Sequence, residues 1–229
     1  DIEDSTFNYG GMMATQTQLE ALFSKFGIEK DDTLVIYDEK GLCDAIRLWW
    51  VLQQYNFTKV KLLNGGLTTL RVANQHLTKV IPSFSETNFT FQGEKNSNLY
   101  ASKEQMHDAV KTNAVILDTR TTDEFAGKYI KKGAYRAGRI PTSKLIDWAN
   151  AINYDGDMKI KPVAELKEIY ADINHNLNDT VYVYCHSGVR SAHTTFVLTQ
   201  LLDYKHVLNY DGSWTEWSYH QELPIENDI

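Results

Sequence analysis

The chain has 229 residues, of which 42% are hydrophobic and 23% charged, and its formal net charge is −7 at pH 7. These values are typical of a folded protein with one large domain or two ordinary ones, and the negative charge disfavours nucleic acid as a partner because phosphate binding depends on clustered Lys and Arg. No apolar run approaches the length of about 18 residues needed for a membrane span. Two distant cysteines make neither a disulfide framework nor a metal quartet. We therefore expect a cytoplasmic protein without metal, organic cofactor or membrane partner.

The first predicted helix carries an apolar stripe with the spacing i, i+3, i+4 and i+7, and Gly27 marks its end. An apolar run at 34–37 predicts a buried strand, and a short loop and a second amphipathic helix follow it. A second strand begins near Val60, before a turn at Gly65. The stripe consists of Leu19, Leu22, Phe23 and Phe26.

This pattern occurs again 147 positions later without a gap, which indicates an internal repeat. The stripe maps onto Leu166, Ile169, Tyr170 and Ile173, and the strand 34–37 maps onto 181–184. Strands that alternate with helices predict a parallel sheet covered on both faces. Further matched pairs are Gly41 and Gly188, Ala45 and Ala192, Gln53 and Gln200, Val60 and Val207, and Gly65 and Gly212.

The second copy has one earlier predicted strand, 114–118, whose counterpart would lie ahead of Asp1. The N-terminal sheet is thus expected to have one strand fewer than the C-terminal sheet, either because the chain is cut or because residues ahead of Asp1 exist. Residues 81–98 are polar and rich in Asn, Ser and Glu. The expected organisation is an α/β fold with a truncated N-terminal domain (1–80), a linker (81–98) and a C-terminal domain (99–229).

The loop with the most distinctive chemistry begins at Cys185, directly after the strand 181–184. Ligands of α/β folds bind at this carboxyl end of parallel strands. The loop sequence His-Ser-Gly-Val-Arg-Ser can curl so that its backbone N–H groups point at the sulfur, and such a nest at a helix N-terminus favours thiolate over thiol. A buried structural cysteine is the alternative, which the polar residues and Gly after the strand disfavour.

Loop length separates two kinds of chemistry. Cysteine phosphatases place five residues between Cys and Arg, whereas four separate Cys185 from Arg190 here. The shorter loop encloses a smaller anion, such as the terminal sulfur of a persulfide.

The loop resembles the active-site loop of rhodaneses, the thiosulfate and mercaptopyruvate sulfurtransferases. The resemblance extends to 118–120 with 124–125, to 138–141, to 211–217, and to 37–38, 48–50 and 64–66 in the first copy. It implies a tandem protein in which Cys185 carries sulfur as a persulfide. The N-terminal domain would be inactive, because Asp38 takes the position of Cys185 and Cys43 aligns with Arg190 on a helix.

The resemblance also suggests which residues bind the substrate. Arg190 binds an anionic donor or pairs with an acidic neighbour, while Lys132 and Arg136 steer the anion or form a solvated basic loop. Asp118 and Arg120 are expected to form a structural ion pair. Mercaptopyruvate-preferring members carry arginine near the position of Glu124, so the carboxylate here disfavours that donor. The residues assigned to substrate binding are His186, Ser187, Gly188, Val189, Arg190, Ser191 and Arg136.

The predicted function is transfer of sulfane sulfur from thiosulfate, or a related donor such as 3-mercaptopyruvate, to cyanide or to a thiol acceptor such as a thiol protein. The partners would be a small anionic sulfur donor and that acceptor. Two alternatives stay open: a non-catalytic sulfur-relay or binding module, and a cysteine phosphatase or arsenate reductase-like enzyme.

Overall fold

Both copies of the strand–loop–helix unit are present in the computed structural model, which describes residues 2–173 and 176–228. Leu34 pairs with Val60 in the N-terminal half, and Val181 pairs with Val207 in the C-terminal half, all in parallel. Both pairs are related by the offset of 147, so the register inferred from the sequence is confirmed. The elements of the N-terminal half are α1 (Gln16–Lys25), β1 (Leu34–Ile36), α2 (Cys43–Gln54), β2 (Val60–Leu62) and α3 (Gly66–Val72).

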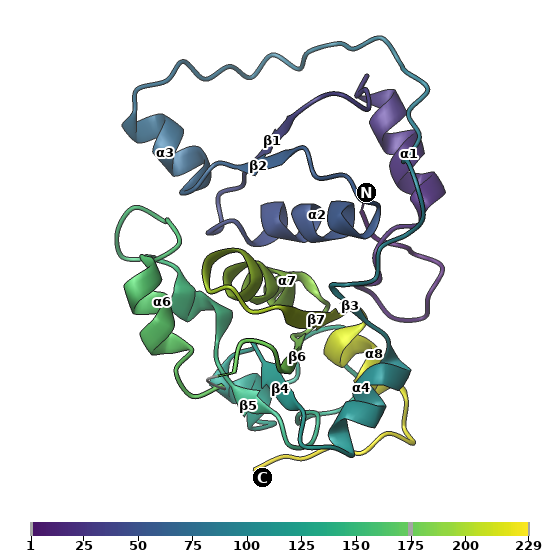
Figure 1. Cartoon of the computed structure of the whole chain (residues 1–229), viewed down its shortest axis with the longest axis vertical. Coiled ribbons are helices and arrows are strands. Elements are labelled where there is room, and N and C mark those ends of the chain that lie inside the picture. Colours follow the sequence, from purple (N-terminus) through teal and green to yellow (C-terminus); the bar gives the residue numbers. More distant parts are fainter. Residues whose placement is uncertain (1, 174–175, 229) are drawn as a thin grey trace.

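The C-terminal half is built on a five-stranded parallel sheet with the order β3-β7-β6-β4-β5 (Figure 1). Its strands are β3 (Tyr100–Ala101), β4 (Val115–Asp118), β5 (Lys144–Leu145), β6 (Thr180–Tyr184) and β7 (His206–Tyr210). Its helices are α4 (Lys103–Val110), α5 (Thr122–Phe125), the 3₁₀ helix η1 (Trp148–Ala151), α6 (Val163–Ile169), α7 (Val189–Phe196), the π-helix η2 (Val197–Leu201) and α8 (Ser213–Tyr219).

Alternate side chains of this sheet face two separate cores, because successive residues of a strand point to opposite faces. Val181 and Val183 of β6 pack with residues of α6 and η2 on one face. Tyr184 and Tyr210 pack with α4 and α8 on the other. The α/β architecture with helices on both faces is therefore as expected from the sequence.

The difference in strand number between the two sheets is larger than predicted. The described part of the N-terminal half contains two strands and the C-terminal sheet contains five. The difference is therefore three strands, whereas a difference of one was predicted. The offset of 147 gives no position within this chain for counterparts of β3, β4 and β5. Of these three strands only β4 was predicted, because β3 and β5 are two residues long and carry no periodic signal.

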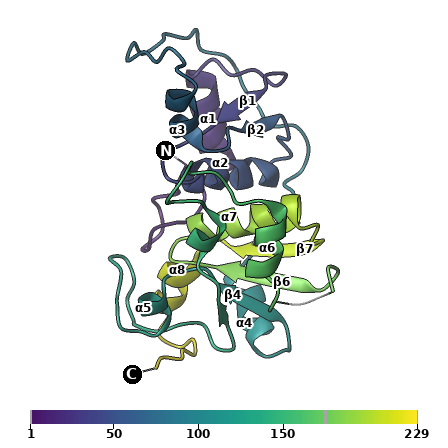
Figure 2. The same cartoon turned by 90° about the vertical axis from the view of Figure 1, so that its left-hand side faces the viewer.

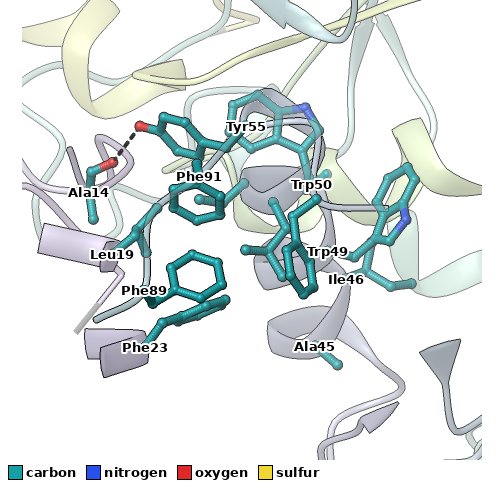
Figure 3. Close-up of a cluster of buried hydrophobic side chains, with 14 of the residues drawn as sticks. Ala14, Leu19, Phe23, Ala45, Ile46, Trp49, Trp50, Tyr55, Phe89 and Phe91 are labelled. Atoms are coloured by element: carbon teal, nitrogen blue, oxygen red, sulfur yellow. Dashed lines mark hydrogen bonds between the residues drawn. The ribbon is translucent and has the colours of Figure 1, made fainter. Parts of the chain in front are cut away.

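Part of the polar segment 81–98 packs into the N-terminal core. Phe89 and Phe91 are buried there, and their ring centroids lie 5.0 Å and 5.8 Å from that of Phe23. Figure 3 shows the Phe91 ring beside Tyr55, whose hydroxyl donates to the Ala14 carbonyl, and the Phe89 ring beside Phe23. Most residues of the segment are exposed and polar, so its composition gave no sign that Phe89 and Phe91 are buried.

The two halves meet along α2 and α7, which lie side by side in both views (Figures 1 and 2). Trp49 of α2 packs edge-on against Phe196 of α7, with ring centroids 5.0 Å apart. Because each helix follows the loop after a central strand, this packing brings the loop regions of both halves close to the boundary.

A buried ion pair closes the end of β4, as the sequence suggested. Arg120 lies 2.6 Å from Asp118, and the Tyr184 hydroxyl also donates to Asp118 at 2.7 Å. Within the described ranges, no helix combines the length and apolarity of a membrane crossing.

Candidate active site

The Cys185 loop joins the end of β6 to the start of α7, at the carboxyl edge of the parallel sheet. The backbone N–H groups of Cys185 and Gly188 donate to the Ser213 hydroxyl at 3.1 and 3.0 Å, and that hydroxyl donates to the Tyr210 carbonyl. The Trp214 N–H donates to the Cys185 carbonyl at 3.0 Å. The start of α8 therefore fixes the shape of the loop.

Gly188 is required by this shape. Its φ of +75° is in the left-handed region, and a Cβ at this position would lie 2.5 Å from the Asp211 carbonyl oxygen. Its own carbonyl accepts from Asn209 at 3.1 Å. The loop thus packs against the segment after β7 too closely for any side chain at position 188.

The Cys185 thiol lies at the centre of the loop, with 1% of its surface exposed. Burial by itself raises the pKa of this thiol, but the Arg190 guanidinium, the Ser191 hydroxyl and the backbone N–H groups of Ser191 and Ser187 outweigh it, so the pKa is lowered. The Ser191 hydroxyl donates to Sγ at 3.4 Å. These contacts stabilise the thiolate, which is the nucleophilic form of cysteine.

The equivalent loop of the N-terminal half contains a bound anion of its own, the Asp38 carboxylate. Four backbone N–H groups donate to it at 2.8 to 3.0 Å. Successive N–H groups that converge in this way form an anion-binding nest. Since the two loops are related by the repeat, the fold of this loop is itself an anion cradle. The donors belong to Lys40, Leu42, Asp44 and Ala45, and the offset of 147 maps them onto Ser187, Val189, Ser191 and Ala192.

Arg190 pairs with an acidic neighbour, one of the two roles considered for it. Its two terminal nitrogens lie 2.8 Å from the two oxygens of Glu124, and both side chains are largely buried. Burial raises the pKa of Glu124, but the hydrogen bonds and charge of Arg190 prevail and lower it to about 2. The carboxylate at position 124 therefore binds the loop arginine.

His186 is uncharged near neutral pH, because burial lowers its pKa to about 4. Its Nε2 lies 3.0 Å from the Lys132 carbonyl oxygen, so the neutral ring donates to that carbonyl rather than to an incoming anion. His186, Ser187 and Val189 nevertheless line the pocket in front of the loop.

Arg136 is not among the residues that line this pocket. Its guanidinium donates to backbone carbonyls at the end of α8 and beyond, among them those of His220 at 2.8 Å and Leu223 at 3.2 Å. These hydrogen bonds hold the C-terminal segment in place. None of them corresponds to the expected role of Arg136 in steering an anion. Lys132 does line the pocket.

The N-terminal half contributes residues to the site that the sequence analysis missed. Arg47 of α2 donates to Asp211 at 2.6 Å, to the Gly11 carbonyl at 2.8 Å and to the Gly188 carbonyl at 3.4 Å. Gly11 itself approaches Ser187 so closely that a Cβ on it would lie 2.6 Å from the Ser187 Cβ. A lone arginine amid the apolar residues of α2 was the available signal for this contact.

A pocket of about 430 Å³ lies between the halves in front of the Cys185 loop. Its size suits a small anion or the tip of a larger acceptor. Among the described residues no three His, Cys, Asp or Glu side chains form a metal site. The pocket is lined by Ile2, Glu3, Gly10, Gly11, Asp44, Arg47, Lys132, Gly133, His186, Ser187, Val189 and Thr215.

The second cysteine, Cys43, starts α2 and is buried. Burial raises its pKa, and the proximity of Cys185 adds to the effect. Both effects favour the protonated thiol of Cys43.

Comparison with known proteins places this architecture in one family. The Rhodanese-like domain family matches residues 5–71 and 102–220. A thiosulfate sulfurtransferase of Corynebacterium glutamicum is 34% identical over 213 residues, which cover 90% of this chain and 69% of that protein. The sulfur carrier protein TtuD of Thermus thermophilus is 32% identical over 220 residues, with 92% and 76% covered.

Solved structures agree at the level of the fold. The crystal structure of the Tum1 protein from Saccharomyces cerevisiae superposes with a TM-score of 0.85 at 22% identity, and the match covers 99% of this chain and 80% of that one. The two matched segments lie in the two halves related by the repeat. The chain thus belongs to the rhodanese-like domain family, and it contains two copies of that fold.

Proposed function

We propose that this protein is a sulfurtransferase in which Cys185 carries sulfane sulfur from a small anionic donor, thiosulfate or a chemical relative, to a nucleophilic acceptor. The observation that carries the proposal is the anion cradle around Cys185, whose sister cradle binds the Asp38 carboxylate through four backbone N–H groups. Relatives named thiosulfate sulfurtransferase and sulfur carrier protein support the same chemistry.

The reaction has two steps. The Cys185 thiolate attacks the outer sulfur of thiosulfate, and the S–S bond of the donor breaks to release sulfite and leave Cys185–S–S⁻. An acceptor such as cyanide or a thiolate then takes the terminal sulfur and regenerates the Cys185 thiolate. This is covalent catalysis by double displacement, so ping-pong kinetics are expected. The loop amides would stabilise the thiolate and the persulfide in turn.

The donor preference follows from the charges near the loop. Arg190 is neutralised by Glu124, which leaves Lys132 as the exposed cation at the pocket. A single exposed cation favours a compact anion. Position 124 carries a glutamate, where an arginine would be needed to receive the carboxylate of a 3-mercaptopyruvate-type donor. Thiosulfate is therefore the donor that we propose first.

The test compares Cys185→Ser with Cys43→Ser in thiosulfate:cyanide turnover. We expect Cys185→Ser to abolish turnover and Cys43→Ser to retain it, because only Cys185 has a stabilised thiolate. Intact-protein mass spectrometry after thiosulfate treatment should add the mass of one sulfur atom at Cys185, and cyanide should remove it. Equal losses in both variants, or turnover without any adduct under rapid quench, would contradict the assignment.

A second candidate is a sulfur relay that is loaded by a partner and does not use free thiosulfate, as the name of the TtuD relative suggests. A Cys185 persulfide that forms with a protein donor but never with thiosulfate would favour it. Hydrolysis of aryl phosphates at ordinary enzyme rates would instead favour phosphatase chemistry, which the four-residue spacing to Arg190 disfavours.

A further inference from the structure

An exposed basic loop borders the pocket. We use the name basic loop for residues 128–133, with the sequence Lys-Tyr-Ile-Lys-Lys-Gly, all of which are exposed. Tyr129 and Ile130 expose 55% and 52% of their surface. The loop lies in a stretch, 125–146, that contains six basic residues and no acidic one, in a chain with a net charge of −7.

The two arginines of this stretch are committed to the protein itself. Arg136 donates to backbone carbonyls, and Arg139 pairs with Asp228 at 2.7 Å. The basic charge that faces solvent next to the pocket therefore comes from Lys128, Lys131 and Lys132.

The basic loop is packed directly against the Cys185 loop. His186 contacts the Lys132 carbonyl at 3.0 Å, and a Cβ on Gly133 would lie 3.5 Å from the His186 ring. Lys132 and Gly133 line the pocket, while 128–131 are not part of its lining. Whatever binds along the basic loop thus lies beside the pocket in front of the Cys185 loop.

We propose that the basic loop docks an acidic, partly apolar segment of a thiol protein, which takes sulfur from the Cys185 persulfide. This inference rests on the proposed function. Three cations beside two large exposed apolar side chains are complementary to such a segment, whereas a small donor needs only the pocket. In the transfer, the partner thiolate attacks the terminal sulfur, a new S–S bond forms, and the Cys185 thiolate leaves with the electron pair. No oxidant is consumed.

The test uses synthetic peptides as acceptors. One carries a single cysteine flanked by leucine and glutamate, and its match has glutamine at each glutamate. Transfer from thiosulfate is followed by mass spectrometry of the peptide persulfide. Because charge at an interface acts mainly on association, we expect kcat/KM to be on the order of ten-fold higher for the acidic peptide, with the advantage falling as salt rises.

Charge reversal locates the contact. Lys128→Glu/Lys131→Glu should remove the preference for the acidic peptide while cyanide turnover stays unchanged. The matched control, Lys25→Glu/Lys205→Glu, reverses two exposed charges away from the pocket. Lys25 is the last residue of α1, and Lys205 directly precedes the first residue of β7. This control should keep the preference.

Each outcome decides one point. If the wild-type protein forms no persulfide and turns over no cyanide, the proposed function fails. If cyanide turnover is normal but the acidic and neutral peptides react equally, or the preference survives in Lys128→Glu/Lys131→Glu, the docking surface is wrong. A short oligonucleotide that inhibits transfer as strongly as a cysteine-free acidic peptide of equal charge would overturn recognition of a protein segment.

Discussion

Replacing Arg47 with methionine should cost the protein a large part of its stability. The Arg47–Asp211 pair joins the two halves at 2.6 Å, with 5% and 1% of the side chains exposed. Methionine keeps much of the volume and removes the charge, so Asp211 stays buried with the Met13 N–H, at 2.9 Å, as a remaining donor. Removing one partner of a buried ion pair costs about 3–5 kcal/mol, and we expect a loss of this size in the free energy of unfolding.

The chain offers a matched control in Arg71, whose ion pair with Glu39 is 2.8 Å long but has side chains 58% and 55% exposed. Exposed pairs contribute about 0–1 kcal/mol, so Arg71→Met should change the stability little. Urea denaturation followed by tryptophan fluorescence measures both variants. Burial, rather than the type of contact, would then account for the difference.

A double variant completes the test. Arg47→Met/Asp211→Asn removes both charges, and it should lose at least about 1 kcal/mol less than the sum of the single losses, because coupled partners are not additive. If the single losses add within about 0.5 kcal/mol, or if Arg47→Met costs no more than Arg71→Met, the halves are not joined energetically by this pair.

Three more predictions concern the loops. The pKa of Glu124 is lowered to about 2 from its usual 4.5, so its pair with Arg190 stabilises the fold fully above about pH 4.5 and this stabilisation is lost toward pH 2. In acid titrations, the difference in unfolding free energy between the wild-type protein and Glu124→Gln should therefore vanish across that interval. A difference that stays constant contradicts this. Gly188→Ala should lower both stability and sulfur transfer, since its Cβ would meet the Asp211 carbonyl, and unchanged turnover would refute the strained-loop reasoning. Asp38→Ala should cost about 1–3 kcal/mol in denaturation yet leave cyanide turnover near normal, whereas loss of turnover would mean that the two loops depend on each other.

Much of the fold could be predicted because its signals are local and repeated. The pairing of Leu34 with Val60 and of Val181 with Val207 follows from the offset of 147, and the strand before Cys185 placed this residue at the carboxyl end of the sheet. Strands β3 and β5 were missed since two residues carry no period. Phe89 and Phe91 were missed since single anchors do not change the polar character of a segment.

The environment of Cys185 was less accessible to sequence reasoning. Arg47 lies 141 positions from Gly188, so its contact depends on how α2 packs against α7, which no local pattern specifies. Arg136 has the charge and position of an anion-binding residue, but its choice of backbone carbonyls depends on where the C-terminal segment runs. Ser213 was noted only as part of a motif, and its hydroxyl bonds to two loop amides emerge only from the folded backbone.

The Asp38 carboxylate has a consequence for how the two cradles respond to their surroundings. An anion tethered to the chain has a very high effective concentration at its own cradle, in the same way that linked binding modules outcompete free ones. Sulfate, phosphate or sulfite in solution therefore cannot displace it, and the occupancy of the N-terminal cradle does not depend on the anions in the medium. The Cys185 side chain takes the corresponding position in the other loop, where the same kind of backbone N–H groups stabilise its thiolate, so free oxyanions are expected to compete poorly with that thiolate as well.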